Sequence, residues 1–97
     1  MKDRTLLSHA GRNPAKTCGT VNMPVYRAST VIAPSLAEYE GRQDKGLDEM
    51  CYGAMGTTTY YALAEAMTRL EHGAGSVITS SGLSACTMAI LPFVSAG

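Results

Sequence analysis

The chain has 97 residues, 45% of them hydrophobic, and its eight basic residues are balanced by eight acidic ones. This length suits one small domain that can bury a core. The neutral charge and the absence of tryptophan remove the case for nucleic acid or an anionic membrane as a partner.

The cysteines and histidines are too scattered to predict a cross-link or a metal site. Cys18, Cys51 and Cys86 are odd in number, widely spaced and include no Cys-x-x-Cys pair. His9 and His72 are single, and such histidines are more often surface residues than ligands or bases. This cysteine usage is typical of a reducing cytoplasm, and no stretch reads as a signal peptide or a membrane span.

Residues 1–34 show little periodicity and are punctuated by glycines and prolines. The sequence therefore predicts an irregular arm, with a short extended piece over residues 25–32. Long irregular arms often serve binding or assembly, and a disordered tail is the alternative interpretation.

A short helix is predicted after Ser35, which can cap it by accepting a hydrogen bond from an early backbone N–H. Gly41 should weaken this helix soon after it begins. The polar residues 41–50 that follow are expected to form a mobile connection.

The clearest helix follows the three threonines at 57–59, one of which supplies the N-cap. Spacings of three and four predict one packed apolar face made by Tyr60, Leu63, Met67 and Leu70. Glu65 and Arg69 stand four apart, in the favourable order for an ion pair. Gly73 is placed to adopt the left-handed conformation that ends a helix.

A short strand is predicted over residues 76–79, followed by a turn and a helix over residues 83–94. This helix is apolar nearly all round and is therefore expected to be buried, and Pro92 should kink or end it. One strand between two helices cannot make a sheet by itself. The pattern therefore predicts the beginning of a larger α/β domain.

The turn Ser81-Gly82-Leu83 joins the predicted strand to the predicted helix. Free backbone N–H groups and the helix dipole favour an anion there. Gly82 lets the backbone come close to such an anion, and Ser81 adds a hydroxyl. The same Ser-Gly pair also serves as an ordinary helix cap, so the turn by itself leaves both interpretations open.

Several stretches occur in the order and at the spacing of one enzyme family. They are HAGRNP, VNMPVYRAST, the Tyr52-Gly53 pair, the helix end LEHGAG and the Ser-Gly turn. Together they resemble the N-terminal part of the transsulfuration enzymes, which are pyridoxal-phosphate enzymes of cysteine and methionine metabolism. The likeness is nearest to bacterial cystathionine β-lyases and covers nearly the whole chain.

The resemblance implies the first helix–strand–helix of a fold-type I, transferase-like pyridoxal-phosphate domain. Residues 1–58 would be the N-terminal arm and an intersubunit segment, and residues 59–97 would begin the large cofactor-binding domain. The implied assembly is a homodimer or homotetramer in which the arm wraps onto the neighbouring subunit.

The implied cofactor is pyridoxal 5'-phosphate. By the family pattern, the amides of Gly82 and Leu83 hold its phosphate beside Ser81, and Tyr52 reaches the phosphate from the neighbouring subunit. The implied reaction cleaves cystathionine to homocysteine, pyruvate and ammonia.

No catalytic residue is expected in this chain. The family's cofactor-binding lysine lies downstream of residue 97, and the lysines present here, Lys2, Lys16 and Lys45, sit in polar stretches typical of the surface. These residues alone are therefore expected to have no lyase activity.

Two positions depart from the family pattern. Ala54 stands where the family has an arginine that contacts the phosphate, and Arg27 or Arg42 would have to compensate for its loss. Pro92 stands where the family has an ordinary helix former. Two alternatives therefore remain: another reaction of the family (γ-synthase, γ-lyase or sulfhydrylase), and a non-catalytic chain limited to subunit contacts.

Overall fold

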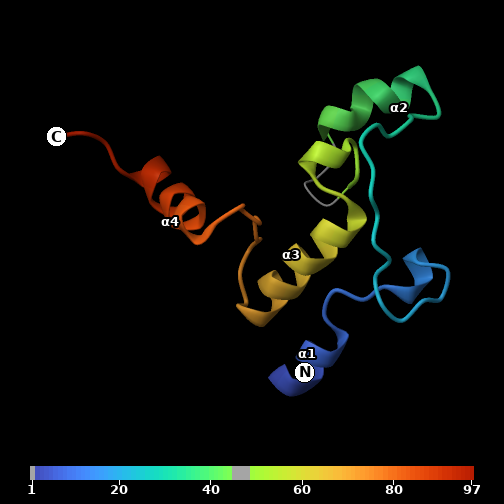
Figure 1. Cartoon of the computed structure of the whole chain (residues 1–97), viewed down its shortest axis with the longest axis horizontal. Coiled ribbons are helices and arrows are strands. Elements are labelled where there is room, and N and C mark those ends of the chain that lie inside the picture. Colours follow the sequence, from blue (N-terminus) through green and yellow to red (C-terminus); the bar gives the residue numbers. More distant parts are fainter. Residues whose placement is uncertain (1, 45–48) are drawn as a thin grey trace.

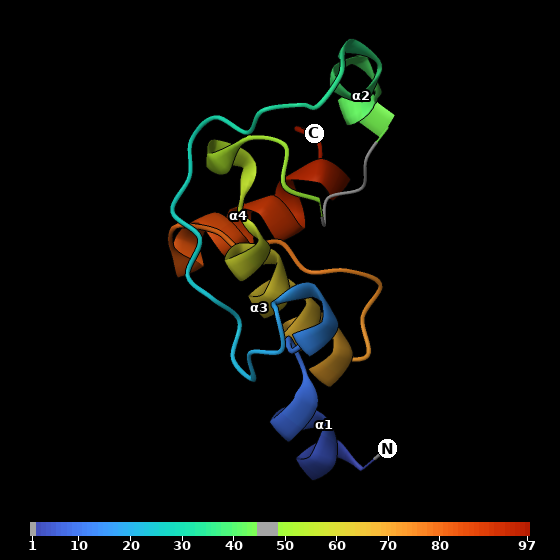
Figure 2. The ribbon, with the colours of Figure 1, turned by 90° about the vertical axis from the view of Figure 1, so that its right-hand side faces the viewer.

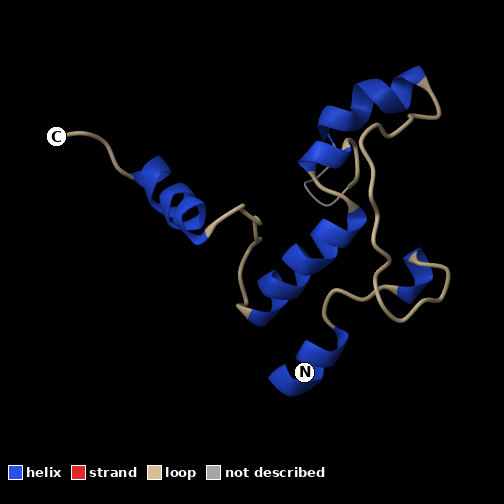
Figure 3. Ribbon diagram, viewed as in Figure 1, coloured by secondary structure: helices blue, strands red, loops and turns tan. Residues whose placement is uncertain are grey.

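The computed structural model describes residues 2–44 and 49–97, and these residues are helical where they are regular (Figures 1 and 3). The α-helices are α1 (Asp3–His9), α2 (Leu36–Glu40), α3 (Thr58–Leu70) and α4 (Gly82–Ile90). Short 3₁₀ turns, η1 to η4, occupy Pro14–Lys16, Gly41–Asp44, Gly53–Met55 and Leu91–Phe93. Lys45 and the rest of the polar stretch at 45–48 lie outside the described residues.

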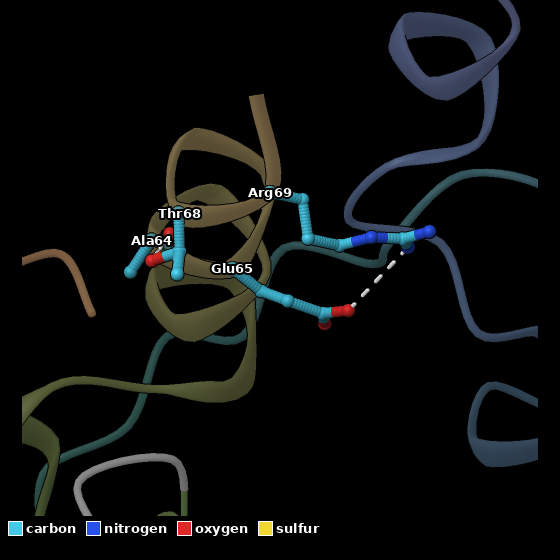
Figure 4. Close-up of polar contacts among 4 residues, drawn as sticks. All are labelled: Ala64, Glu65, Thr68 and Arg69. Carbon is cyan, nitrogen blue, oxygen red and sulfur yellow. Dashed lines mark hydrogen bonds and ion pairs between the residues drawn. The ribbon is translucent and has the colours of Figure 1, made fainter. Parts of the chain in front are cut away.

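The predicted position of the α3 N-cap and the predicted ion pair on this helix are confirmed, but the capping bond is not. Thr57 occupies its N-cap with an extended backbone, although the threonine hydroxyl makes no capping bond. Glu65 and Arg69 form the expected ion pair at 3.7 Å, and Thr68 donates its hydroxyl to the Ala64 carbonyl at 2.8 Å (Figure 4). An exposed pair of this kind stabilises a helix by only about 0.3 kcal/mol.

The end of α3 differs by one residue from the prediction. His72, and not Gly73, adopts the left-handed conformation, with φ of 52°. Gly73 instead donates its N–H to the Thr68 carbonyl at 2.9 Å and so closes the last turn. This is a Schellman arrangement, in which the left-handed residue precedes the residue that makes the closing bond.

The N-terminal residues contain a helix that the sequence analysis did not predict. α1 lies against α3, and Leu6 is its buried residue, at 8% exposure (Figures 1 and 2). The chain then turns at Gly11, where a Cβ would lie 2.7 Å from the Ala62 carbonyl oxygen of α3. A seven-residue helix is unstable by itself. Packing on α3 therefore determines whether α1 forms, which is why the hydrophobic periodicity of residues 3–9 did not predict it.

The predicted core face of α3 is wrong for this structure. Leu63 and Met67 are 54% and 42% exposed, whereas the buried residues of α3 are Ala62 and Ala64. The close approach of Gly11 to Ala62 places the N-terminal segment on the alanine side of the helix. Within the described residues, Leu63 and Met67 have no covering element, whereas Tyr60 and Leu70 at the two ends of the stripe are half-buried.

The short helix and the extended piece of the arm agree with the sequence predictions. Ser35 caps α2 by accepting a hydrogen bond from the Glu38 N–H at 3.2 Å, and Gly41 is the C-cap. Residues 25–32 contain no helix, and Thr30 makes an isolated antiparallel bridge with Tyr52.

The strand predicted over residues 76–79 does not form. Backbone groups of a strand need a neighbouring strand, and the described parts of the chain provide none at this point. Residues 74–77 and one face of α3 instead line a groove of about 410 Å³. The α/β class therefore remains a prediction for a larger domain.

α4 begins one residue before the predicted range of 83–94 and ends four residues before its end, and it is not buried as predicted. It ends at Ile90, and Pro92 lies in the 3₁₀ turn that follows. Leu83 is 79% exposed and Phe93 86% exposed. Among the described elements α4 contacts only that 3₁₀ turn, and it projects away from α3 (Figure 1). None of the described helices is long and apolar enough to cross a membrane.

Candidate functional site

The start of α4 has the geometry of a capped helix with free donors. Ser81 is the N-cap, with an extended backbone (φ −156°, ψ 159°), and its Oγ accepts the Ser84 N–H at 3.1 Å. The backbone N–H groups of Gly82 and Leu83 have no acceptor among the described residues. Two parallel N–H groups and the positive end of the helix dipole therefore point away from the helix.

The space in front of these donors is open. A Cβ built at Gly82 would meet no atom within 4 Å, and Leu83 is exposed. Ser81 Oγ accepts the Ser84 N–H in the capping bond and donates its proton to Ser84 Oγ at 3.1 Å, so it is a donor that a ligand would have to compete for. These donors fit a phosphate group, which needs several N–H or O–H groups on one side and room on the other.

Two side chains of α3 hold the segment that leads into this turn. The Tyr60 hydroxyl donates to the Ile78 carbonyl at 3.0 Å and accepts the Ile78 N–H at 3.1 Å. The hydroxyls of Thr68 and Ser76 lie 2.8 Å apart. Tyr60 therefore satisfies both backbone groups that a neighbouring strand would otherwise satisfy, three residues before Ser81.

The sequence pattern does not reveal this role of Tyr60. Spacing alone predicts Tyr60 as an apolar member of the helix stripe, whereas its hydroxyl makes the specific contact. The available signal was that a half-buried tyrosine usually finds a polar partner. The identity of that partner depends on tertiary structure.

We expect Tyr60→Phe to release the turn from α3. The substitution removes two hydrogen bonds, each worth about 1 kcal/mol, and keeps the ring. Amide hydrogen exchange at Ile78 should therefore accelerate by more than tenfold, while the amides in the middle of α3 keep their protection. Tyr61→Phe, which removes a hydroxyl bonded to the Met55 carbonyl at 3.2 Å, is the matched control. Unchanged exchange at Ile78 would contradict the anchoring role.

Tyr52 lies apart from the start of α4. It precedes the 3₁₀ turn Gly53–Met55, and its side chain is 46% exposed. That turn and α4 make no contact within the described structure. The structure thus groups Ser81, Gly82 and Leu83 at one helix end and places Tyr52 elsewhere on the same chain.

Arg27 and Arg42, which could compensate for the arginine missing at position 54, have different surroundings. Arg42 donates to the Val31 carbonyl, and its guanidinium carbon lies 5.2 Å from the centre of the Tyr39 ring. Arg27 is exposed, with no partner among the described residues. Ala54 itself is also exposed.

The remaining polar candidates lie on the surface. Lys2 and Lys16 are exposed, as are both histidines, and His72 Nε2 is 3.9 Å from Asp3 Oδ1. Cys18, Cys51 and Cys86 are free thiols. No cluster of three potential metal ligands occurs in the parts of the chain that were described.

The chain matches a known family over almost its whole length. The model of the family described as Cys/Met metabolism PLP-dependent enzyme matches residues 4–97. A protein of Rhizobium johnstonii, provisionally named a cystathionine beta-lyase, is 43% identical over 93 residues, covering 96% of this chain and 22% of the relative. The cystathionine beta-lyase of Escherichia coli is 37% identical over 94 residues, covering 96% of this chain and 24% of the relative.

Relatives with other activities are also similar to the chain. The L-alanine/L-glutamate racemase of Wolbachia pipientis is 33% identical over 107 residues, covering 100% of this chain and 27% of the relative. The cystathionine gamma-lyase of Bacillus subtilis is 30% identical over 93 residues, covering 96% and 22%. The chain thus spans 22% to 27% of the length of these curated relatives. Because the family model matches nearly every residue, the chain belongs to the pyridoxal-phosphate-dependent enzymes of cysteine and methionine metabolism, whose cofactor is pyridoxal 5'-phosphate.

Proposed function

We propose that this chain is the N-terminal part of a carbon–sulfur lyase that cleaves cystathionine to homocysteine, pyruvate and ammonia. The observation that carries the proposal is the start of α4, where two unpaired N–H groups face open space beside a serine hydroxyl. The relatives named cystathionine beta-lyase support the choice of reaction.

In this proposal the chain supplies part of the binding site for the cofactor phosphate. The amides of Gly82 and Leu83 and the Ser81 hydroxyl bind the phosphate of pyridoxal 5'-phosphate. When bound, that cofactor supplies the electron sink that lets an amino acid lose its α-proton and expel a sulfur substituent. Residues 59–97 accordingly begin the cofactor domain of an α/β, fold-type I protein, and residues 1–58 form the arm and the intersubunit segment.

Tyr52 acts on the cofactor of a second copy of the protein. Its exposed ring and the lack of contact between its 3₁₀ turn and α4 both support a contact between subunits rather than within one. The assembly would then be a homodimer or homotetramer. The unpaired cysteines fit a reducing cytoplasm as its compartment.

A second candidate is cleavage on the other side of the sulfur, the reaction of a γ-lyase. The similarity to the Bacillus subtilis cystathionine gamma-lyase favours it. Ala54, which carries no charge for the phosphate, favours a chain without catalysis, limited to subunit contacts. The cleavage products separate these possibilities, because β-cleavage yields the three-carbon keto acid pyruvate and γ-cleavage yields the four-carbon 2-oxobutyrate.

The test begins with the coding sequence after codon 97, followed by expression of the complete reading frame. The purified protein is incubated with pyridoxal phosphate and L-cystathionine, and the keto acid and the free thiol are identified. We expect pyruvate and homocysteine in equal amounts. Release of 2-oxobutyrate and cysteine would support the γ-lyase. A stop codon after Gly97, or a protein that binds no cofactor, would support the non-catalytic alternative.

A further inference from the structure

The arm crosses the Tyr52–Gly53 pair at backbone contact. A Cβ built at Gly53 would overlap the Ala28 carbonyl oxygen and lie 2.9 Å from the Ser29 Cα. Both obstacles are backbone atoms, so no side-chain rotation could relieve them. The Gly53 N–H donates to the Ser29 carbonyl at 2.7 Å across this crossing.

The arm is held on both sides of the crossing as well. On the N-terminal side, Thr59 Oγ1 accepts the Tyr26 N–H at 2.9 Å and donates to the Pro24 carbonyl. On the C-terminal side, Arg42 donates to the Val31 carbonyl, and the Gly53–Ser29 hydrogen bond is itself part of the antiparallel bridge between Thr30 and Tyr52. Residues 24–31 are therefore bound to their own chain and form one unit with the Tyr52 segment.

This arrangement determines where Tyr52 stands. Its backbone is extended (φ −157°, ψ 135°), and it makes the bridge to Thr30 directly before the crossing at Gly53. Successive side chains of an extended backbone point to opposite sides, so the bridge to Thr30 fixes the side of the backbone from which the Tyr52 ring projects. A side chain at position 53 would push the arm backbone away and break this bridge.

We propose that Gly53 is a positioning residue for the cofactor phosphate: by carrying no side chain, it lets the arm clamp Tyr52 in the orientation that presents its hydroxyl to the neighbouring subunit. This inference rests on the proposed role of Tyr52. The new element is that the arm influences the cofactor site by fixing Tyr52 of its own chain. This effect is separate from any contact between the arm and the neighbouring subunit.

The test is a double-mutant cycle in the full-length protein, with equilibrium affinity for pyridoxal phosphate as the measurement. Tyr52→Phe should weaken binding about ten- to a hundredfold, the usual effect of losing one hydrogen bond to a charged group. Gly53→Ala should weaken it by a similar factor. The double variant should bind no more weakly than Tyr52→Phe alone, because residues that act through one another are not additive. Gly41→Ala is the matched control, since its φ of −72° suits alanine and no atom lies near its Cβ.

A merely structural role for Gly53 would give a different pattern. Gly53→Ala would then weaken binding by the same factor in the Tyr52→Phe background as in the unmodified protein, which would overturn the proposal. If Tyr52→Phe leaves affinity unchanged while Gly82→Pro lowers it, the phosphate site stands and the positioning role fails. If neither variant changes affinity, the proposed function fails as well.

A second measurement needs no variant that could misfold. In the cofactor-free protein, the Gly53 amide should exchange with solvent at least tenfold more slowly than the Gly82 amide. The reason is that the former is bonded to Ser29 and the latter has no acceptor in the described structure. Equal exchange at the two amides would show that the arm is not clamped and would overturn the proposal.

Discussion

Gly82→Pro is expected to weaken pyridoxal phosphate binding by about ten- to a hundredfold while leaving α4 intact. Proline removes one of the two free N–H donors, and a hydrogen bond to a charged group contributes about 1.5–3 kcal/mol. The helix should tolerate the change because Gly82 is its first residue, the position where proline is most favoured. The extended backbone of Ser81 also suits a residue that precedes proline.

Affinity is measured by titrating the cofactor-free full-length protein with pyridoxal phosphate and following its absorbance. The matched control is Thr58→Pro, which places the same residue at the first position of α3, after the extended N-cap Thr57. We expect that variant to bind within twofold of the unmodified protein. Unchanged affinity of a folded Gly82→Pro protein would show that the start of α4 does not hold the phosphate.

The 97-residue chain by itself is expected to unfold without a cooperative transition and to self-associate. Its buried hydrophobic residues among those described are Leu6, Ala62 and Ala64, and no side chain there is below 2% exposure. The radius of gyration is 16.1 Å, whereas a compact chain of this size measures about 13 Å. The apolar area buried is therefore too small to offset the conformational entropy of ordering the chain.

The exposed apolar surface is concentrated after α3. Residues 73–97 contain no charged side chain, and α4 exposes its large apolar residues with nothing in the described structure packed on them. Such a patch promotes association. Calorimetry and light scattering after size exclusion test the expectation. A sharp thermal transition from a monodisperse monomer would contradict it.

A pair of variants locates the source of the association. Phe93→Glu, at a position 86% exposed beside α4, should reduce the associated fraction several-fold. Ile32→Glu, at a position 87% exposed on the arm, should change it little, because Ile32 is not part of the uncharged segment. Equal effects of the two substitutions would show that general hydrophobicity, rather than the α4 surface, drives association.

The features that the sequence predicted correctly are those that neighbouring residues determine. Ser35 caps α2 because its hydroxyl reaches a donor three residues away, and Ser81 caps α4 in the same way. α4 ends before Pro92, since proline cannot continue the backbone hydrogen bonding. Glu65 and Arg69 pair because one helical turn brings them together.

The features that the sequence alone did not predict depend on residues far apart in the chain. α1 forms where Leu6 can pack on α3, and the strand at residues 76–79 is absent because it lacks a partner. Tyr60 proved to be an anchor for Ile78, a contact 18 residues away in sequence that no local pattern encodes.

The candidate site also has a part that local sequence determines and a part that depends on contacts between distant segments. By itself the sequence determined the family and the capped helix start at Ser81, because a helix cap is a local structure and the family's motifs are linear. The role of Ser81, Gly82 and Leu83 in holding the phosphate stays a prediction. Tertiary structure alone decided that the arm lies across Gly53 and that Tyr52 stands apart from α4. The physical reason is that backbone contacts between distant segments depend on how the whole chain packs, and side-chain identity along one segment does not specify them.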